Sequence, residues 1–360
     1  MFLARSGRRA LMEKIREQVE PTDFLYGFHE VLLRRKDAEI VEVASSVGWL
    51  SRWINRFFQK TLAQNFHLLS VFRDMGFRKR SICCFTNIDS IALPLSFLKL
   101  LGIHHFHLIH VSQGLTNVFE GSRARRIHAS GVGLMKLLLS PIEDLVVLGE
   151  GAASSIQQYL GVRSRCVQYG VDTRYWSRED GTSKISEPYL LSVGSDANRD
   201  YDTLLSAVFP IKTKILTQLN LSSPRDQFER VECNNSLELR ALYQCSSLII
   251  VTLKNVSQPS GQSTALQAMA MGKCVILTDT KGLWDRKNLV HGENIWLIEK
   301  ESVEVLEEAV DYLLKHSEVR ERIGRAAKHT VEQFFTSEHM GQVLLERMAN
   351  AEYAMQAKLI

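Results

Sequence analysis

The chain has 360 residues, 45% of them hydrophobic and 23% charged, a composition typical of a globular protein and not of a disordered or fibrous one. This length exceeds that of a single hydrophobic core, so we expect two domains. No apolar run reaches the roughly 18 to 20 residues that span a bilayer. The six cysteines include no CxxC pair, which indicates reduced thiols in a cytoplasmic protein and argues against a zinc site.

The formal net charge of +4 is unevenly distributed, because residues 1–180 hold 24 Lys and Arg against 17 Asp and Glu. The basic residues concentrated in 51–80 are Arg52, Arg56, Lys60, Arg73, Arg78, Lys79 and Arg80, and the aromatic residues among them are Trp49, Trp53, Phe57, Phe58, Phe66 and Phe72. Such a segment either meets an anionic membrane or lipid-linked substrate, or is a helix with a solvated basic face and a buried aromatic face. We expect no nucleic-acid partner, since no recognised module accompanies the charge.

Apolar runs alternate with helical segments through the first half of the chain. We predict helices over 10–20 and 22–35, a strand over 40–43, a helical region over 51–76, a strand over 81–85, a helix to 101, strands over 106–111 and 145–148, a helix over 152–160 and a strand over 165–168. The first nine residues are a poor signal peptide, and we assign no element to them. This alternation predicts a parallel, doubly wound sheet.

Residues 173–187 are polar and irregular and predict a linker. The alternation then restarts, with strands over 189–193, 214–218, 228–232, 248–253, 274–279 and 294–298, helices between them, and further helices from 302 onward. Two such domains in tandem predict a cleft between them, with ligands at the carboxyl ends of the strands.

The stretch 248–279 has the clearest local pattern, a buried strand, a polar loop, a helix from Thr264 to Met271, a stop at Gly272 and a second strand. A helix that begins after a loop of small residues presents free N–H groups and a partial positive charge. This arrangement suits a phosphate or diphosphate. An ordinary strand–helix–strand crossover with an exposed polar loop would show the same pattern.

Four segments resemble GT-B glycosyltransferases of the family-4 type. They are Val193-Gly194 with 199–207, 239–243, 268–273 before Val275-Ile276, and Gly170-Val171-Asp172. The resemblance covers about 145–300 and is only general over the first 140 residues. It implies an α/β protein with two doubly wound, Rossmann-like domains facing a cleft. The first would span 1–178 and the second 186–337, and a helix over 338–360 would cross back to the first.

The resemblance implies a nucleotide-diphosphate sugar donor, linked to UDP, GDP or ADP, which the second domain binds without a metal or other cofactor. By motif, Gly194 and Ser195 would lie beneath the donor phosphates, and Arg199 would stabilise the charge that builds on the leaving diphosphate. The further residues implied at the phosphates, sugar or ribose are Ser260, Gly261, Gln262, Ser263, Thr264 and Gln267. The family commonly has two glutamates eight positions apart, where this chain has Pro259 and Gln267.

Further candidates lie at other predicted strand ends. His110 either faces the cleft and contacts donor or acceptor, or is a core histidine with its hydrogen bonds satisfied. Gln113 and Gly114 are acceptor-side candidates, and Asn235 either lines the base pocket or belongs to an exposed turn. The histidines clustered before this point are His104, His105 and His107. No carboxylate accompanies the cluster in sequence, so we expect no metal site.

The resemblance implies a glycosyltransferase that transfers a hexose to a hydroxyl of a glycan, lipid-linked or small acceptor, as in polysaccharide biosynthesis. The resemblance implies retention at the anomeric carbon. We expect a cytoplasmic protein, with peripheral contact at the inner membrane face if 51–80 binds anionic lipid. The alternatives are a sugar-nucleotide epimerase and a non-catalytic protein that binds a sugar nucleotide or a partner glycosyltransferase.

Overall fold

A computed structural model of the chain describes residues 1–44, 48–75, 83–103, 105–120, 129–178, 187–221 and 225–356. The chain forms two compact units. Unit 1 comprises Met1–Lys14, Leu25–Val167 and Met340–Ile360, and unit 2 comprises Ile15–Phe24 and Gln168–His339. The predicted first domain, 1–178, differs from unit 1 at Ile15–Phe24 and at 168–178, because both segments form their contacts with residues of unit 2.

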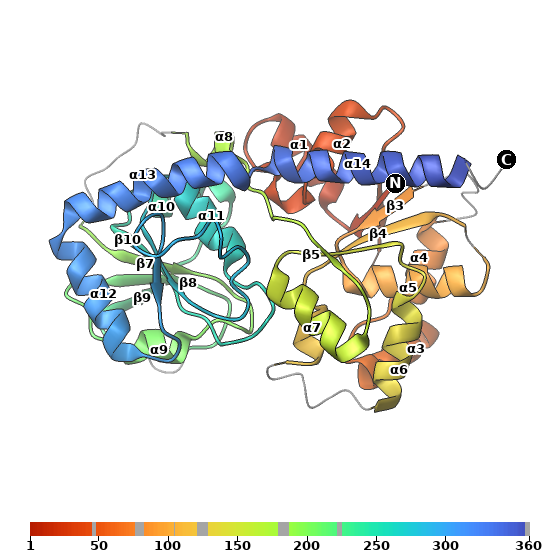
Figure 1. The fold of residues 1–360 in the computed structure, drawn as a ribbon, viewed down its shortest axis with the longest axis horizontal. Helices are drawn as coiled ribbons and strands as arrows, with labels where there is room; N and C mark the ends of the chain where they lie inside the picture. Colours follow the sequence, from red (N-terminus) through yellow and green to blue (C-terminus); the bar gives the residue numbers. More distant parts are fainter. Residues whose placement is uncertain are drawn as a thin grey trace. The chain divides into compact units, whose positions relative to one another are not determined.

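Unit 1 is a parallel sheet with helices on both faces (Figure 1). Its elements are β1 (Phe2–Arg5), α1 (Arg8–Arg16), α2 (Phe28–Arg34), β2 (Ile40–Val43), α3 (Trp49–Leu62), α4 (Leu68–Met75), β3 (Cys83–Thr86), α5 (Asp89–Leu100), β4 (His107–Ser112), the 3-10 helix η2 (Leu115–Val118), α6 (Ala129–Leu139), β5 (Asp144–Val147), α7 (Glu150–Leu160), β6 (Arg165–Cys166) and α14 (Ser337–Gln356). The last two residues of α1 and the first three of α14 belong to unit 2.

The described strands of unit 1 are ordered β2-β1-β3-β4-β5-β6, and every neighbouring pair is parallel. We predicted no element in the first nine residues, and this was wrong. β1 lies between β2 and β3, and Phe2, Leu3 and Ala4 are fully buried. Three apolar residues are too short a run to show periodicity, so pairing with two distant strands is what makes them a strand.

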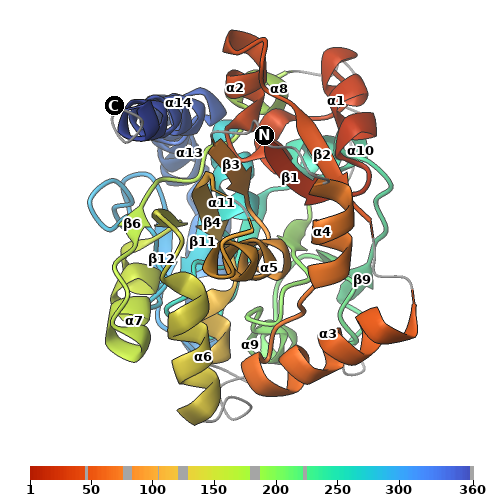
Figure 2. The same cartoon turned by 90° about the vertical axis from the view of Figure 1, so that its right-hand side faces the viewer.

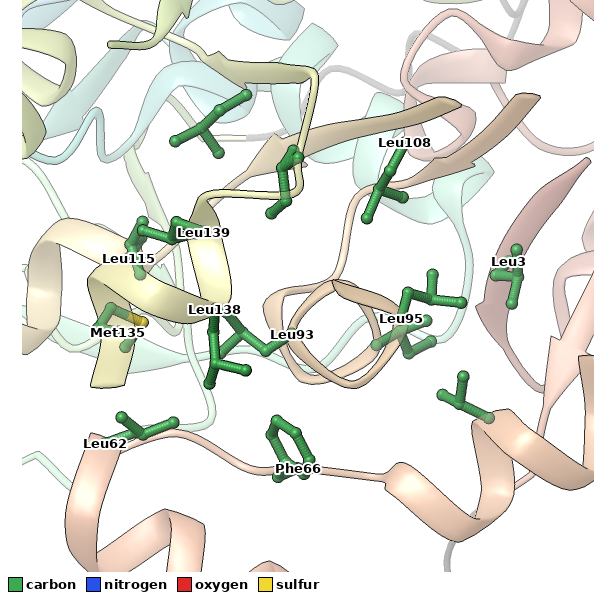
Figure 3. Packing of buried hydrophobic residues seen from close by; sticks show 14 of the residues in the cluster. Leu3, Leu62, Phe66, Leu93, Leu95, Leu108, Leu115, Met135, Leu138 and Leu139 are labelled. Atoms are coloured by element: carbon green, nitrogen blue, oxygen red, sulfur yellow. The ribbon is translucent and has the colours of Figure 1, made fainter. Parts of the chain in front are cut away.

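Side chains on the two faces of the sheet form separate clusters. On one face Phe2 contacts Phe28 and Phe85, with ring centroids 4.8 and 5.0 Å away. On the other face Leu3 joins the cluster that lies under α4, α5 and α6. Figure 3 shows Leu93 of α5 and Leu138 of α6 pointing toward each other in this cluster.

Helix α3 lies at the rim of unit 1 beside α6 (Figure 2). Its inner face is apolar, with Leu62 fully buried and Phe58 stacked on Phe66 at 3.8 Å. Its outer face carries large aromatic side chains, since Trp49, Trp53 and Phe57 are 74, 63 and 52% exposed. The interpretation of this segment as a helix with a buried aromatic face therefore holds only for Phe58 and Phe66. Arg78, Lys79 and Arg80 lie outside the described residues.

Unit 2 is a second parallel sheet, whose described strands are ordered β12-β11-β10-β7-β8-β9. Its elements are the 3-10 helix η1 (Thr22–Leu25), of which Leu25 belongs to unit 1, α8 (Thr173–Trp176), β7 (Leu190–Val193), α9 (Tyr201–Ser206), β8 (Thr213–Leu216), β9 (Phe228–Arg230), α10 (Ser236–Cys245), β10 (Leu248–Val251), α11 (Gln262–Ala270), β11 (Val275–Thr278), β12 (Trp296–Ile298), α12 (Val303–Lys315) and α13 (Ser317–Phe334). The two parallel sheets confirm the predicted α/β class.

The sheet of unit 2 is covered on both faces, as its continuous apolar strands require. Leu190, Leu248 and Ile276 belong to one cluster with residues of α9 and α12, and α11 packs against α13. The predicted linker 173–187 is wrong at its start, because α8 lies there and Trp176 is fully buried in unit 2. Residues 179–186 lie outside the described part of the chain.

None of the helices in the described ranges is long and apolar enough to cross a membrane.

Gly27 provides a test of the contact between α2 and α14. It has a positive φ of 78°, and a Cβ atom there would lie 2.6 Å from the Gly341 backbone nitrogen. We expect Gly27→Ala to lower the free energy of unfolding by more than about 1 kcal/mol, because backbone strain and a backbone clash add. The measurement is chemical denaturation. Gly7→Ala is the control, since Gly7 also has a positive φ but open space around it. An equal loss in both variants would show that the contact is unimportant.

Candidate functional site

The loop between β7 and α9 lies over the carboxyl ends of β7 and β10, the two middle strands of unit 2. Asp200 N donates a hydrogen bond to Thr252 O at 3.0 Å, and Lys254 N donates to Asn198 O at 2.9 Å. From β7 the chain runs to β8 and β9 on one side, and then returns to β10 and β11 on the other. The strand order therefore reverses between β7 and β10, the point where open α/β sheets bind ligands.

Arg199 is held in this loop with one of its nitrogens unpaired. Its Nε donates to Asp196 Oδ2 and its Nη2 donates to Thr264 Oγ1, each at 2.9 Å. The residue is only 5% exposed, and its Nη1 is buried without a hydrogen-bond partner. An unpaired buried donor on a charged group is costly and requires an explanation. An anionic ligand at this point would supply the missing acceptor.

Two glycines shape the space around the guanidinium. A Cβ atom on Gly194 would lie 2.1 Å from Arg199 Nε, and one on Gly261 would lie 3.1 Å from Nη1 and 2.5 Å from Val251 Cγ1. Both residues have positive φ, 150° and 69°. Glycine at these positions thus lets the guanidinium lie against the backbone. Gly194 is directly beneath Arg199, while the exposed Ser195 accepts a hydrogen bond from Gln218 N at 2.8 Å.

The first turn of α11 lies next to this guanidinium. The helix begins after Gly261, which supplies no side-chain cap. The N-terminus of a helix carries a partial positive charge that suits an anion. The other predicted residues at this turn are Ser260, Gln262, Ser263 and Thr264, of which all but Ser263 are buried. Ser260 Oγ accepts a hydrogen bond from Asn198 Nδ2 at 2.9 Å. The structure therefore brings Gly194, Arg199 and the 260–264 loop together.

Gln267, predicted to contact ribose, lies one turn further along α11 and is only 4% exposed. Its Nε2 donates to Asp23 Oδ2 at 2.9 Å, and its Oε1 accepts from the Tyr243 hydroxyl at 3.4 Å. Both ends of the amide are thus engaged inside unit 2. Ribose binding by Gln267 stays a prediction, and it would require the side chain to leave these partners.

Asp23 is a residue that sequence reasoning missed. It is fully buried and accepts hydrogen bonds from Asp172 N at 2.5 Å, Trp176 Nε1 at 2.8 Å and Gln267 Nε2. Burial raises the pKa of Asp23 to about 7, although the three hydrogen bonds favour the ionised form. Its partner on α11 is 244 positions away, so no local pattern could have identified it.

Asn235 acts as the N-cap of α10. Its Oδ1 accepts a hydrogen bond from Glu238 N at 2.9 Å, and its Nδ2 donates to Glu238 Oε1 at 3.0 Å. Asp200 caps α9 in the same way, through Thr203 N at 3.2 Å. The structure thus gives Asn235 a structural role, and a role in the base pocket stays a prediction.

His110 lies in the interior of unit 1, at the carboxyl end of β4, and is 1% exposed. Its Nδ1 lies 3.1 Å from Thr86 O, and its Nε2 lies 2.8 Å from Asp89 Oδ1. Both ring nitrogens therefore have partners, as in the core-histidine alternative. In the next loop Gln113 donates to Asn87 O and accepts from the Tyr26 hydroxyl, each at 2.8 Å.

Gly114 lies at the same end of unit 1. A Cβ atom there would lie 3.6 Å from Asp89 Oδ2. The expectation that no carboxylate accompanies the histidines was wrong. His107 Nε2 lies 2.9 Å from Asp144 Oδ2, and Asp89 pairs with His110. Even so, no group of three or more potential metal ligands occurs among the described residues, which do not include His104.

Unit 2 also has an open pocket of about 640 Å³ at the carboxyl ends of β11 and β12. Its cations include Arg286, which donates to Asp279 Oδ1 at 2.7 Å. The lining of this pocket contains none of the predicted site residues.

Residues 225–330 match the family model "Glycosyl transferases group 1". No curated protein matches the sequence. Several solved structures share the fold. HepE of Anabaena in complex with UDP and glucose is 11% identical, with a TM-score of 0.68 over 97% of this chain and 98% of that one.

Two further structures agree with this fold. A glycosyltransferase from Rickettsia africae is 12% identical, with a TM-score of 0.61 over 97% of both chains. Sucrose-phosphate synthase from Thermosynechococcus elongatus is 16% identical, with a TM-score of 0.63 over 76% of this chain and 74% of that one. The chain therefore has the GT-B fold, and its segment 225–330 resembles group 1 glycosyl transferases.

Proposed function

We propose that this protein is a glycosyltransferase that takes a hexose from a nucleotide-diphosphate sugar. The observation that carries the proposal is the buried, unpaired Nη1 of Arg199 beside the first turn of α11. A guanidinium and the positive end of a helix dipole are together suited to a diphosphate. The match of 225–330 to glycosyl transferases and the fold shared with a UDP-bound protein support it.

The chemistry follows from the charge on the leaving group. As the bond to the anomeric carbon breaks, negative charge builds on the β-phosphate, and donors fixed beforehand stabilise it. Arg199 is fixed by Asp196 and Thr264 and by the backbone beneath it, so it needs little reorganisation. We propose transfer to a hydroxyl of a glycan or lipid-linked acceptor, with retention as the expected stereochemistry.

Arg199→Ala tests this proposal. We expect it to weaken binding of UDP, GDP or ADP by about 10- to 100-fold, because a charge-assisted hydrogen bond is lost. Isothermal titration measures the affinity, and release of free nucleotide from UDP-, GDP- and ADP-sugars measures turnover. Arg320→Ala is the control, since Arg320 is a partly buried arginine of unit 2 that donates to Leu313 O and lies apart from this site.

The outcomes of this experiment separate the candidate functions. Failure of every nucleoside diphosphate to bind the wild-type protein would reject the proposal. Tight binding without turnover, with any acceptor tested, would favour a non-catalytic sugar-nucleotide-binding protein. Interconversion of free sugar nucleotides without an acceptor would favour an epimerase.

We further propose that α3 contacts an anionic membrane surface, which suits a lipid-linked acceptor. The exposed aromatic residues Trp49, Trp53 and Phe57 are four positions apart and form one stripe along the helix. The exposed cations in the adjacent stripe are Arg52, Arg56 and Lys60, and α3 contains no acidic residue. Interfacial aromatic rings beside cations favour an anionic lipid surface over a neutral one.

Trp53→Ala tests this membrane contact. We expect it to reduce cosedimentation with vesicles of phosphatidylcholine and phosphatidylserine, and we expect added salt to weaken wild-type binding. Tyr353→Ala is the control, because Tyr353 is an equally exposed aromatic residue of unit 1, 77% exposed on α14. Equal binding by wild type and Trp53→Ala would reject the contact. A change in oligomeric state without vesicle binding would instead make the stripe an interface between copies of the chain.

A further inference from the structure

Arg199 and Asp23 are both bound to helix α11 by buried hydrogen bonds. Arg199 Nη2 donates to Thr264 Oγ1, which itself donates to Val193 O at 3.2 Å, and the Tyr243 hydroxyl donates to Gln267 Oε1. Gln267 Nε2 then donates to Asp23. Thr264 and Gln267 are three positions apart on α11 and therefore share one face of that helix. The rotation of α11 about its axis is thus fixed by two contacts on the same face.

We propose that Asp23 is a positioning residue for the diphosphate site: through Gln267 it holds α11, and with it Thr264 and the guanidinium of Arg199, in the geometry that binds a nucleoside diphosphate. This inference rests on the proposed function of Arg199. It adds that the segment Ile15–Phe24 supplies part of the support for the donor site in unit 2. Asp23 does not touch the ligand and acts only through its partners.

The identity of residue 267 follows from the same contact. Asp23 Oδ2 accepts from both Trp176 Nε1 and Gln267 Nε2, so it requires an N–H donor at position 267. A glutamate there would place a second carboxylate about 3 Å from Asp23 in a buried site, and the pair would then have to take up a proton. The amide of Gln267 is thus the group that an ionised Asp23 needs.

The groups that face Asp23 determine how it responds to pH. Asp172, which opposes ionisation, has its own carboxylate bound to Tyr175 N at 3.0 Å and Thr22 N at 3.1 Å. The Tyr169 hydroxyl donates to Asp23 O at 3.4 Å. From α10, burial raises the pKa of Tyr243, which stays neutral, and Arg240 donates to Tyr175 O at 2.9 Å.

The ionised form of Asp23 accepts the Gln267 bond most strongly, and burial raises the pKa of this carboxyl to about 7. Nucleotide affinity should therefore rise as the pH increases through neutrality. The nucleotide's own phosphate titrates as well, so the informative quantity is the difference between wild type and a variant that cannot ionise at position 23.

The experiment measures UDP, GDP and ADP affinity between pH 6 and 8, together with KM and kcat for the sugar nucleotide that turns over. We expect Asp23→Asn to weaken binding about tenfold and to raise KM more than it lowers kcat, because one positioning hydrogen bond is lost. In Asp23→Asn, the part of the rise in nucleotide affinity with pH that is due to Asp23 should be absent. Gln267→Glu should weaken binding, and the double variant Asp23→Asn/Gln267→Glu should recover part of the loss because it restores an amide–carboxylate pair.

Asp285→Asn is the matched control. Asp285 is another buried carboxylate of unit 2 and accepts hydrogen bonds from Lys287 N, Asn288 N and Asn288 Nδ2. The Asp285→Asn substitution should lower the melting temperature of the protein without changing its nucleotide affinity. If Asp23→Asn does not fold, Tyr243→Phe provides the test, because it removes only the hydroxyl that donates to Gln267 Oε1. An Asp23→Asn protein with wild-type affinity and pH profile would overturn the inference, as would an unchanged Tyr243→Phe.

The two proposals fail in distinguishable ways. Absence of nucleotide binding by the wild-type protein would reject the proposed function, and this inference with it. Wild-type binding that Arg199→Ala abolishes and Asp23→Asn leaves intact would reject the positioning role alone.

Stability provides an independent readout at Asp23. An aspartate carboxyl ordinarily has a pKa of 3.8, whereas the pKa of Asp23 is about 7 in the folded protein. Between these values the folded state holds a proton that the unfolded state has released, so stability falls as the pH rises from about 4 to about 7 and is constant above. Asp23→Asn should remove this fall. Denaturation across this range, compared with Asp285→Asn, measures it, and an unchanged slope would show that Asp23 does not titrate there.

Discussion

One buried carboxylate connects distant segments of unit 2. Asp23 accepts hydrogen bonds from the backbone of Asp172, the indole of Trp176 and the amide of Gln267, and so joins three separate parts of the chain. A buried carboxylate is tolerated only when donors surround it, and removing one donor leaves a charge without compensation. The positions of α8 and α11 are therefore coupled to a segment that is distant from both in sequence.

The two charged groups bound to α11 differ in how far their hydrogen bonds are satisfied. At one end three N–H donors saturate the Asp23 carboxylate, while at the other the Arg199 guanidinium has two partners and one free nitrogen. Such a system has an excess of positive charge at only one end. The low dielectric of the interior strengthens the attraction for an anion at that end. Asp23 thus has all of its hydrogen-bond partners and keeps its part of unit 2 rigid. Arg199 lacks one acceptor, so its part of unit 2 can bind an anion.

Local patterns were sufficient to predict most of the second sheet and helix α11, whose start we expect to suit a phosphate. β10, α11 and β11 follow from a continuous apolar run, a helical period and a glycine stop, all within 248–279. The resemblance pointed to the Gly194 loop and Arg199 because their motif is short and contiguous, and their role at a phosphate stays a prediction. The features that the sequence did not predict depend on contacts between residues far apart in the chain. β1 is a strand only because β2 and β3 flank it, and Asp23 is buried only because of residues about 150 and 244 positions away.

The aromatic helix α3 shows a different limit. Its periodicity predicted an amphipathic helix, but both of its faces contain aromatic rings, so composition could not decide which rings are buried. Phe58 lies on the inner face because it stacks on Phe66. The other three rings, Trp49, Trp53 and Phe57, are exposed to solvent. The distinction comes from tertiary packing.

The inclusion of Ile15–Phe24 in unit 2 has a consequence for biosynthesis. Asp23 leaves the ribosome 244 residues before its partner Gln267. At synthesis rates of roughly 5 to 20 residues per second, the segment waits about 12 to 50 s before α11 exists. Unit 1 can form its sheet from β1 to β6 during this interval, apart from the last helix, whereas unit 2 cannot satisfy Trp176 and Gln267 until the early peptide is brought to them. The segment Ile15–Phe24 is thus among the last parts of the chain to reach its final place.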